Sequence, residues 1–153
     1  MRFTLDSNIL IYAFDGLAGS RHDVASKLVL AAMDSDCVLT VQALGEFLNV
    51  VSRKRRDLLE DAEHQVSRWQ KVFPAIGTKP EHLVLAAEFS RRYKLQYFDS
   101  LIFWVAKSAG ATVLLSEDWQ DGFSVEGVTI ANPFASKNAG MLAVCLAPDP
   151  SVQ

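Results

Sequence analysis

The sequence predicts an α/β fold around a mostly parallel sheet. Short apolar segments with the composition of buried strands, such as CVLT and TVLLS, alternate with longer segments whose apolar residues recur every three or four positions. Strands that alternate with helices in this way are typical of parallel sheets, because a crossover helix returns the chain to the same edge. The expected strands are residues 2–5, Cys37–Thr40, 73–77, 112–116 and a last short strand within 125–133.

Helices are expected between these strands. Ser7 is a suitable N-cap for a helix over residues 8–14, because its hydroxyl can accept a hydrogen bond from the first turn. The helix over residues 99–109 contains the apolar run LIFWVA and should be buried on most sides. The remaining helices are expected over residues 20–33, Val41–Lys54, 57–72 and 79–93.

The length of 153 residues suits one domain, and half of the residues are hydrophobic, which is enough to form a core. We expect a compact domain over residues 1–134. Residues 135–153 are rich in Ala, Pro and Ser and show no clear periodicity. This C-terminal tail is therefore expected to lie outside the core and to be partly disordered.

Charge and composition limit the functions that the chain can have. The formal net charge is −3, so any nucleic-acid site must be made locally by a basic patch or a bound cation. Cys37 and Cys145 lie far apart and form no metal-binding or redox pair. Asp6 interrupts the first apolar run too early for a signal peptide, and no segment reaches the roughly 20 apolar residues of a membrane helix. These features predict a cytoplasmic protein without a membrane partner.

Four carboxylates stand at or near the ends of the expected elements. Asp6 follows the first strand and Asp118 lies just past the strand over 112–116, so both should project from the carboxyl edge of the sheet. Ligands bind at this edge in parallel α/β folds. Asp99 begins the buried helix, and Glu46 lies inside the helix Val41–Lys54. The delivery of two aspartates to one edge by two separate strands favours a shared site.

Each of these residues also has a simpler interpretation. Asp6 or Asp99 can serve as a helix cap, and Asp118 can take part in ordinary turn chemistry. Glu46 lies on a polar stripe, which by itself is typical of a solvated helix face. The other residues of this stripe are Gln42, Asn49 and Arg53.

A convergent cluster of these carboxylates would need a cation, because carboxylates within a few ångströms repel one another unless protons or cations intervene. Oxygen ligands without His or Cys nearby in the sequence favour Mg²⁺ or Mn²⁺ over Zn²⁺. Mg²⁺ held by few carboxylates keeps several waters, one of which can attack a phosphodiester. Such a cluster would therefore indicate metal-dependent hydrolysis. No GxSxG, GxGxxG or P-loop motif points to another enzyme class.

Four segments of the sequence resemble the successive acidic motifs of the PIN domain. They are LDSNILIY, LGEFLNV, YFDSLIFWVA and VLLSEDWQDG, and the match runs over residues 2–134. The set is similar to the VapC-type toxins of bacterial toxin–antitoxin systems. The resemblance implies a three-layer α/β/α fold, ribonuclease activity with Mg²⁺ or Mn²⁺ as cofactor, a small antitoxin as partner, and a homodimer.

The resemblance also implies roles for the carboxylates. It places Asp6, Glu46, Asp99 and Asp118 in a catalytic acidic site. Asp6, Asp99 and Asp118 would hold one or two metal ions, while Glu46 would complete the cluster and position the attacking water. Cleavage of single-stranded RNA would leave a 3′-hydroxyl and a 5′-phosphate.

Supporting residues follow from the same motifs. Asn8 is expected to donate a hydrogen bond behind the metal ligands, and Ser116 to hold a carboxylate or a metal-bound water. Glu117 and Asp121 lie close to the last motif and could assist or replace Asp118. The identity of the fourth acidic residue therefore stays open.

Two other functions also stay open. Asp6 at a strand end suits a phosphoryl-accepting enzyme or a receiver-like domain, although the motif is DSN rather than DxD and no well-placed Lys follows a later strand. A non-catalytic module that binds RNA or an antitoxin would keep the fold without turnover. The basic runs 53–56 and 91–94 could contact RNA phosphates, or could complement the dipoles of helix C-termini.

Overall fold

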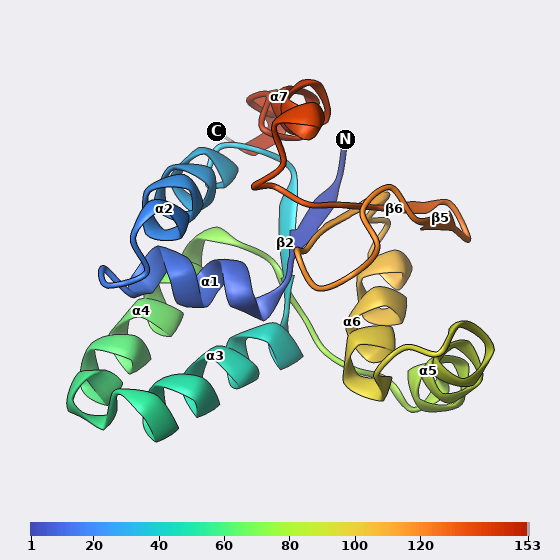
Figure 1. Ribbon diagram of the computed structural model, residues 1–153, viewed down its shortest axis with the longest axis horizontal. Helices are drawn as coiled ribbons and strands as arrows, with labels where there is room; N and C mark the ends of the chain where they lie inside the picture. Colours follow the sequence, from blue (N-terminus) through green and yellow to red (C-terminus); the bar gives the residue numbers. More distant parts are fainter. Residues whose placement is uncertain (153) are drawn as a thin grey trace.

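The computed structural model describes residues 1–152 and shows a six-stranded sheet between two groups of helices (Figure 1). The strands lie in the order β3-β2-β1-β4-β6-β5, and every neighbouring pair is parallel except β5 and β6. The predicted α/β fold with a mostly parallel sheet is thereby confirmed. The strands are β1 (Phe3–Leu5), β2 (Cys37–Thr40), β3 (Ala75–Ile76), β4 (Val113–Leu115), β5 (Ser124–Val125) and β6 (Val128–Ala131).

The helices form the outer layers. Figure 1 shows α1 to α4 on one side of the central strands and α5 and α6 on the other. The α-helices in residues 1–152 are α1 (Ser7–Phe14), α2 (Ser20–Ala32), α3 (Val41–Lys54), α4 (Leu59–Val72), α5 (Pro80–Tyr93), α6 (Tyr97–Ser108) and α7 (Ala139–Cys145). Three short 3₁₀ helices are η1 (Arg56–Leu58), η2 (Ser136–Asn138) and η3 (Pro150–Val152).

Two helices begin directly after the strands that precede them. α3 follows β2 without a loop, because the Thr40 hydroxyl accepts a hydrogen bond from the Ala43 amide at 3.0 Å and caps the helix. α1 follows β1 in the same way, but its cap differs from the one that the sequence predicted. The N-cap is Asp6, whose Oδ1 accepts a hydrogen bond from the Ser7 amide at 2.7 Å, and Ser7 is the first helical residue. The prediction that Ser7 caps the helix was therefore wrong.

The core lies on both faces of the sheet. Every residue of β1, β2 and β4 is buried, which explains why these strands appear in the sequence as continuous apolar runs. α6 is buried along most of its length, as its apolar run predicted. Aromatic rings join α5, α6 and the loop after β4: Phe89 of α5 stacks on Phe103 of α6 with a centroid distance of 4.5 Å, and Phe103 stacks on Trp119 of the loop at 5.9 Å.

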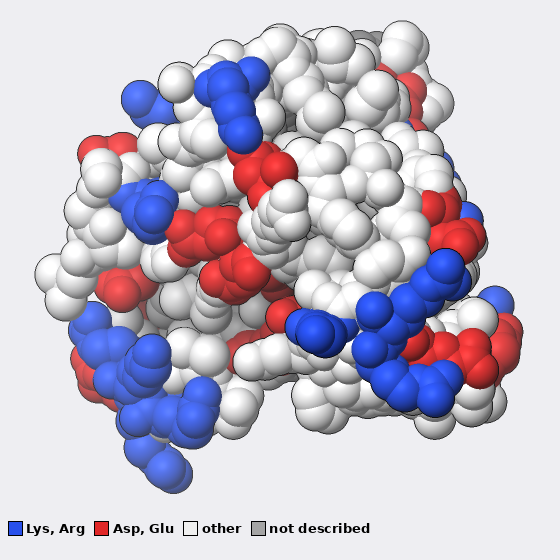
Figure 2. All heavy atoms as spheres, turned by 45° about the vertical axis from the view of Figure 1, so that its right-hand side comes forward, with Lys and Arg blue, Asp and Glu red and all other residues white. Residues whose placement is uncertain are grey.

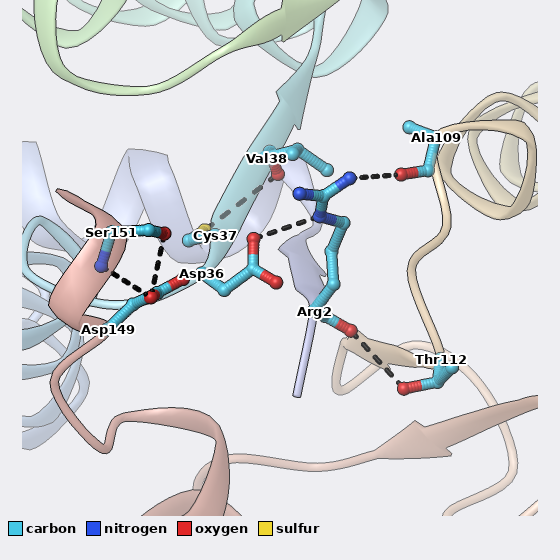
Figure 3. Close-up of polar contacts among 8 residues, drawn as sticks. All are labelled: Arg2, Asp36, Cys37, Val38, Ala109, Thr112, Asp149 and Ser151. Atoms are coloured by element: carbon cyan, nitrogen blue, oxygen red, sulfur yellow. Dashed lines mark hydrogen bonds and ion pairs between the residues drawn. The ribbon is translucent and has the colours of Figure 1, made fainter.

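Arg2 joins three elements at the amino edge of the sheet (Figure 3). Its Nε donates to Asp36 Oδ1 at 2.9 Å, at the start of β2, and its Nη1 donates to the Ala109 carbonyl at 2.8 Å. Its own carbonyl accepts a hydrogen bond from the Thr112 amide at 2.9 Å, next to β4. The guanidinium therefore satisfies a carbonyl at the C-terminal end of α6 while it fixes the entry of β1 into the sheet.

The C-terminal segment packs on this same amino edge. Cys145 of α7 is only 1% exposed and its sulfur contacts the Met1 sulfur, while the Asp149 amide donates to the Asp34 carbonyl at 2.9 Å. For residues 135–153 the sequence predicted a tail outside the core and partly disordered, which stays a prediction; the structure has short helices in this segment up to residue 152. Residue 153 lies outside the described residues, and the predicted limits of the compact domain, 1–134, stay a prediction. Within residues 1–152, no helix is long and apolar enough to cross a membrane.

Candidate active site

The pairing of β1 with β4 brings the first and last acidic motifs together. Leu5 pairs with Leu115 in this parallel register, and the Asp6 amide donates to the Leu115 carbonyl at 3.0 Å. The next residues on the two strands, Asp6 and Ser116, therefore leave the sheet side by side at its carboxyl edge. This is the edge at which parallel α/β folds bind their ligands.

Asp6 is buried, with an exposed fraction of only 4%. Its Oδ1 accepts a hydrogen bond from the Ser7 amide, and its Oδ2 accepts one from the Ser116 hydroxyl at 2.7 Å. Burial raises the pKa of Asp6 above its usual value, and these two hydrogen bonds oppose the rise because they favour the charged form. The negative charges of Asp118 and Glu46, which line the same cavity as Asp6, raise the pKa of Asp6 further.

Glu46 reaches the same place from α3. Its Oε2 accepts a hydrogen bond from the Ser7 hydroxyl at 2.8 Å, and its Oε1 accepts one from Gln42 Nε2 at 2.8 Å. Gln42 also donates to the Phe98 carbonyl at 2.9 Å, which joins α3 to the first turn of α6. At Glu46, the polar stripe of α3 therefore contacts another element of the fold. It is not a helix surface that faces only solvent.

Asp99 lies in the first turn of α6 and is half-buried. Its pKa is raised to about 6, first because burial disfavours the charged form and then because of the negative charges of Asp6, Glu46 and Asp118. All three of the other predicted acidic residues thus act on this one carboxylate. Asp99 is therefore the residue whose pKa is affected by the acidic residues of all three other motifs.

Asp118 follows β4 and is the most exposed of the four carboxylates. Its Oδ2 accepts a hydrogen bond from Asn8 Nδ2, and its amide donates to the Ser116 hydroxyl oxygen at 3.2 Å. Burial and the neighbouring charge of Glu117 raise the pKa of Asp118, while the hydrogen bond from Asn8 lowers it. The Ser116 hydroxyl therefore donates a hydrogen bond to the Asp6 side chain and accepts one from the Asp118 backbone amide.

One cavity of about 610 Å³ unites these groups. It is lined by all four predicted acidic residues, Asp6, Glu46, Asp99 and Asp118, and by Asn8. Figure 2 shows carboxylate atoms gathered near the middle of this face, with Lys and Arg side chains on both sides. Arg53 and Lys94, one from each of the two basic runs seen in the sequence, also line the cavity.

The two alternative carboxylates of the last motif have other contacts. Glu117 accepts a hydrogen bond from the Tyr12 hydroxyl and forms an ion pair with Arg21 at 2.9 Å. Asp121 accepts hydrogen bonds from the Asn132 amide and Asn138 Nδ2, both at 2.9 Å. Neither carboxylate is among the described residues that line the cavity. The structure thus brings Asp118, and not these two neighbours, to the acidic cluster.

The chemistry of the cavity fits a hard divalent cation. Its negatively charged donors are all carboxylate oxygens, with no His or Cys among the described lining residues, and this is the ligand type that Mg²⁺ and Mn²⁺ prefer. Burial is the main cause of the raised pKa values of Asp6 and Asp99, and the neighbouring carboxylates raise them further, a repulsion that a cation would relieve. Within residues 1–152, however, no three His, Cys, Asp or Glu side chains are already arranged to hold an ion. Ion binding would therefore draw these carboxylates closer together.

Two contacts of the site were not predicted from the sequence. Ser7, interpreted there only as a helix cap, bridges Asp6 and Glu46. Gln42 was seen as part of the polar stripe, but its hydrogen bonds to Glu46 and Phe98 depend on how α3 packs beside α6. The position of Ser7 directly after Asp6 was the available signal for the first contact, whereas no local pattern indicates the second.

Comparison with solved structures gives several similar folds. A toxin–antitoxin complex from Klebsiella pneumoniae is similar with a TM-score of 0.64 and 19% identity, covering 86% of this chain and 97% of that one. VapC20 of Mycobacterium tuberculosis, described as a toxin that cleaves the sarcin–ricin loop, has a TM-score of 0.62 and 17% identity, covering 76% and 89%. VapBC2 of Rickettsia felis, bound to a promoter DNA fragment, has a TM-score of 0.62 and 18% identity, covering 86% and 98%.

The sequence itself matches a known family. A search of curated proteins finds no match to the chain. The family model described as the PIN domain matches residues 3–124, a span that contains the four acidic residues of the cavity. This span is well over half of the 153 residues. The chain therefore belongs to the PIN domain family, as its acidic motifs predicted.

Proposed function

We propose that the chain is a metal-dependent endoribonuclease that hydrolyses phosphodiester bonds. The observation that carries this proposal is the convergence of Asp6, Glu46, Asp99 and Asp118, which come from separate elements, around one cavity at the carboxyl edge of a parallel sheet. Two comparisons support it: the chain belongs to the PIN domain family, and the structurally similar VapC20 is described as an RNA-cleaving toxin.

Three carboxylates would hold the metal. Asp6, Asp99 and Asp118 are the proposed ligands, and a bound Mg²⁺ or Mn²⁺ supplies a water of lowered pKa and offsets negative charge on the phosphodiester. Ser116 would keep Asp6 in place through its 2.7 Å hydrogen bond, and Asn8 would do the same for Asp118. These supporting contacts would limit the directions in which the carboxylates can turn.

Glu46 would orient the attacking water. Ser7 and Gln42 each donate a hydrogen bond to one of its carboxylate oxygens, so the side chain is restrained from two directions. A carboxylate held beside the cavity in this way can accept a hydrogen bond from water and direct a lone pair toward phosphorus. In-line attack would leave a 3′-hydroxyl and a 5′-phosphate.

A cleavage assay tests this proposal. Total RNA is incubated with Mg²⁺ or Mn²⁺ and either wild-type protein or Asp6→Asn, which keeps the size of the side chain and removes its charge. We expect cleavage by the wild type and none by Asp6→Asn. The matched control is Asp61→Asn, since Asp61 is exposed on α4 and should leave cleavage unchanged. Equal cleavage by wild type and Asp6→Asn would contradict the proposal.

The phosphoryl-accepting alternative is disfavoured by the environment of Asp6. A nucleophilic carboxylate must present a free oxygen to the phosphorus atom. Asp6 is 4% exposed, and each of its oxygens accepts a hydrogen bond, one from the Ser7 amide and one from the Ser116 hydroxyl. Covalent labelling of Asp6 by a phosphate mimic would restore this alternative.

RNA binding without turnover under any divalent metal would favour the non-catalytic module instead.

The proposed enzyme would be the toxin of a toxin–antitoxin pair. Structures similar to this chain are described as toxin–antitoxin complexes from Klebsiella pneumoniae and as VapBC2 from Rickettsia felis, which supports an antitoxin as partner. A groove of about 350 Å³ between α1, α2 and α4 offers an apolar surface to such a partner. Its lining includes Phe14, Val29, Leu30, Met33 and Trp69.

Growth of a bacterial host tests the toxin role. Expression of the wild type should arrest growth, while Asp6→Asn, expressed to the same level, should not. Normal growth with a wild-type protein that cleaves RNA in vitro would argue against a toxin and leave the ribonuclease proposal standing. The homodimer stays a prediction, and light scattering of the purified protein would measure it.

A further inference from the structure

The Glu117 side chain has contacts that the acidic cavity does not explain. Glu117 immediately precedes Asp118, yet it is not among the described residues that line this cavity, and its side chain is only 13% exposed. One of its carboxylate oxygens accepts a hydrogen bond from the Tyr12 hydroxyl, and the other forms an ion pair with Arg21 Nη2 at 2.9 Å. Both oxygens are therefore engaged on the side of α1 and α2, although the next residue belongs to the acidic cluster.

The two partners of Glu117 are themselves held in place. Tyr12 belongs to α1 and Arg21 to the first turn of α2. The Arg21 guanidinium lies over the Phe134 ring, 4.4 Å from its centroid, and the Phe134 ring packs edge to face on Tyr12 at a centroid distance of 5.7 Å. Tyr12, Arg21 and Phe134, which we call the Glu117 holder, thus fix a hydroxyl and a guanidinium around one carboxylate.

The residue on the other side of Asp118 is fixed to the opposite layer of helices. Trp119 is 8% exposed and stacks on Phe103 of α6 at a centroid distance of 5.9 Å, and its ring centroid lies 6.4 Å from that of Phe89 of α5. Figure 1 shows α1 and α2 on one side of the central strands and α5 and α6 on the other. Asp118 itself is exposed, so the anchored neighbours Glu117 and Trp119 restrict the direction of its backbone.

The polar character of the contact between Glu117 and Arg21 favours a role in orientation over one in stability. Taking charged groups out of water offsets much of their mutual attraction, so an apolar pair of similar size can stabilise a fold as well. A charge-assisted hydrogen bond is directional, however, and it fixes the angle of a side chain as well as its place. The charge of Arg21 also balances that of Glu117, so the pair adds no net charge beside a cavity that already holds four carboxylates.

We propose that Glu117 is a positioning residue, which directs the Asp118 carboxylate toward the metal because the Glu117 holder fixes the backbone just before it. This inference rests on the proposed metal-dependent function, in which Asp118 is a ligand. Asn8 and Ser116 contact the Asp118 side chain and amide directly, whereas Glu117 touches neither the metal nor the Asp118 carboxylate and acts through the chain. Groups that orient a metal ligand commonly change metal affinity by about 10- to 100-fold.

Mn²⁺ binding in the absence of RNA tests this role, with free Mn²⁺ measured by electron paramagnetic resonance. Glu117→Ala should weaken Mn²⁺ binding about tenfold, because the backbone before Asp118 is no longer held. This variant also removes a negative charge, which by itself would weaken the binding of a cation. A second variant therefore has to separate orientation from charge.

Arg21→Ala makes this separation, because the two explanations predict opposite changes. Loss of a positive charge near the site would by itself strengthen Mn²⁺ binding, whereas loss of the contact that holds Glu117 should weaken it. We expect binding about five- to tenfold weaker in Arg21→Ala, and within about threefold of wild type in Arg21→Lys, which keeps the charge and can still donate to Glu117. The matched control is Arg68→Ala, since Arg68 is exposed on α4 and should leave Mn²⁺ binding unchanged.

Thermal unfolding identifies any variant that fails to fold, and Tyr12→Phe then takes its place, because it removes only the hydroxyl that donates to Glu117. Tyr12→Phe should weaken Mn²⁺ binding about threefold. A wild type that binds Mn²⁺ and cleaves RNA, with normal Mn²⁺ binding in Glu117→Ala and Tyr12→Phe, would overturn this inference and leave the proposed function standing. Tighter binding in Arg21→Ala, or a lower Tm with unchanged Mn²⁺ binding in Glu117→Ala, would also overturn it. A wild type that neither binds Mn²⁺ nor cleaves RNA would overturn the proposed function, and the positioning role with it.

Discussion

At the scale of single residues, Ser116 couples the first and last acidic motifs. Its side chain is fully buried, its hydroxyl donates to Asp6 at 2.7 Å, and its oxygen accepts the Asp118 amide at 3.2 Å. The hydrogen bond to Asp6 opposes the rise in the pKa of that carboxyl, so it favours the charged form that a cation requires. A residue that touches no substrate can therefore control the charge of the site.

Replacement of this hydroxyl should weaken metal-dependent cleavage. Ser116→Ala removes the hydrogen bond and should raise the pKa of Asp6 further, so we expect cleavage at limiting Mg²⁺ to fall by about 10- to 100-fold. Excess Mg²⁺ should recover part of the loss, and Ser116→Thr, which keeps the hydroxyl, should recover most of it. The measurement is the cleavage rate as a function of Mg²⁺ concentration. Ser116→Ala with an unchanged Mg²⁺ dependence would show that the hydroxyl has no such role.

The acidic cluster should also make the metal-free protein less stable as the pH rises. The pKa of Asp99 is raised to about 6 in the folded chain from 3.8, so folding favours its protonated form. This stabilisation is complete below about pH 4 and is lost as the pH rises through about 6. Because Asp99 is only half-buried, we expect a loss of about 1 kcal/mol, seen as a fall in Tm of about 2–4 °C.

Thermal unfolding in the presence of a chelator measures this effect. The Tm should fall between about pH 5 and about pH 7.5, and addition of Mg²⁺ at the higher pH should raise it again, since bound ligand stabilises the folded state. Asp99→Asn removes the titrating group and should flatten the curve. A Tm that rises over this pH range in the wild type would contradict the prediction.

At the scale of elements, α3 shows how much a helix pattern can and cannot predict. The sequence predicted β2 and α3 with the bounds that the structure has. The structure shows why they meet without a loop: the buried strand ends at Thr40, whose hydroxyl caps the helix directly. The stripe with Glu46 was equally consistent with a solvated face. The tertiary structure places this stripe in the wall of a cavity, and the hydrogen bond from Gln42 to the Phe98 carbonyl links it to α6.

Gly45 gives a prediction for this helix. Gly inside a helix is less favourable than Ala, and an added Cβ would meet no atom within 4 Å, so Gly45→Ala should raise the free energy of unfolding by about 0.5–1 kcal/mol. Gly110→Ala is the contrasting variant: its φ of 87° suits Gly, and the change should destabilise the chain. Urea denaturation measures both. A destabilised Gly45→Ala would indicate that a neighbour outside this chain contacts that face.

At the scale of the whole molecule, Asp121 connects the loop after β4 to the segment that follows β6. It accepts hydrogen bonds from the Asn132 amide and Asn138 Nδ2 and forms an ion pair with Lys137 at 2.9 Å. These contacts lower the pKa of Asp121 to about 2. The stability that they give is therefore present above about pH 4 and is lost as the pH falls toward 2.

This arrangement separates the roles of two nearby aspartates. Asp121→Asn should lower the Tm by a few degrees at neutral pH and leave kcat unchanged, because it weakens charge-assisted hydrogen bonds to residues that do not line the cavity. Asp118→Asn should abolish cleavage with little change in Tm. Paired measurements of Tm and kcat check both variants. Loss of cleavage in Asp121→Asn with normal Tm would instead place Asp121 at the metal.

The remaining differences between sequence and structure have physical causes. Asp6 and Ser7 can both cap a helix, and only the backbone geometry shows that Asp6 does so. α7 spans seven residues, too few for a period of 3.6 to be visible, so the tail appeared irregular. Glu117, Asp118 and Asp121 share one loop, and their directions depend on partners far away in the sequence, such as Arg21 and Asn132.

The N-terminus of the chain and the acidic cavity lie at opposite edges of the sheet. Arg2 fixes the start of β1 at the amino edge, and Met1 beside it is 59% exposed, whereas the acidic cavity opens at the carboxyl edge. An affinity tag or a sensor-chip tether joined at Met1 would emerge on the side turned away from the cavity. Protein immobilised in this way would keep the acidic cavity toward the flowing sample.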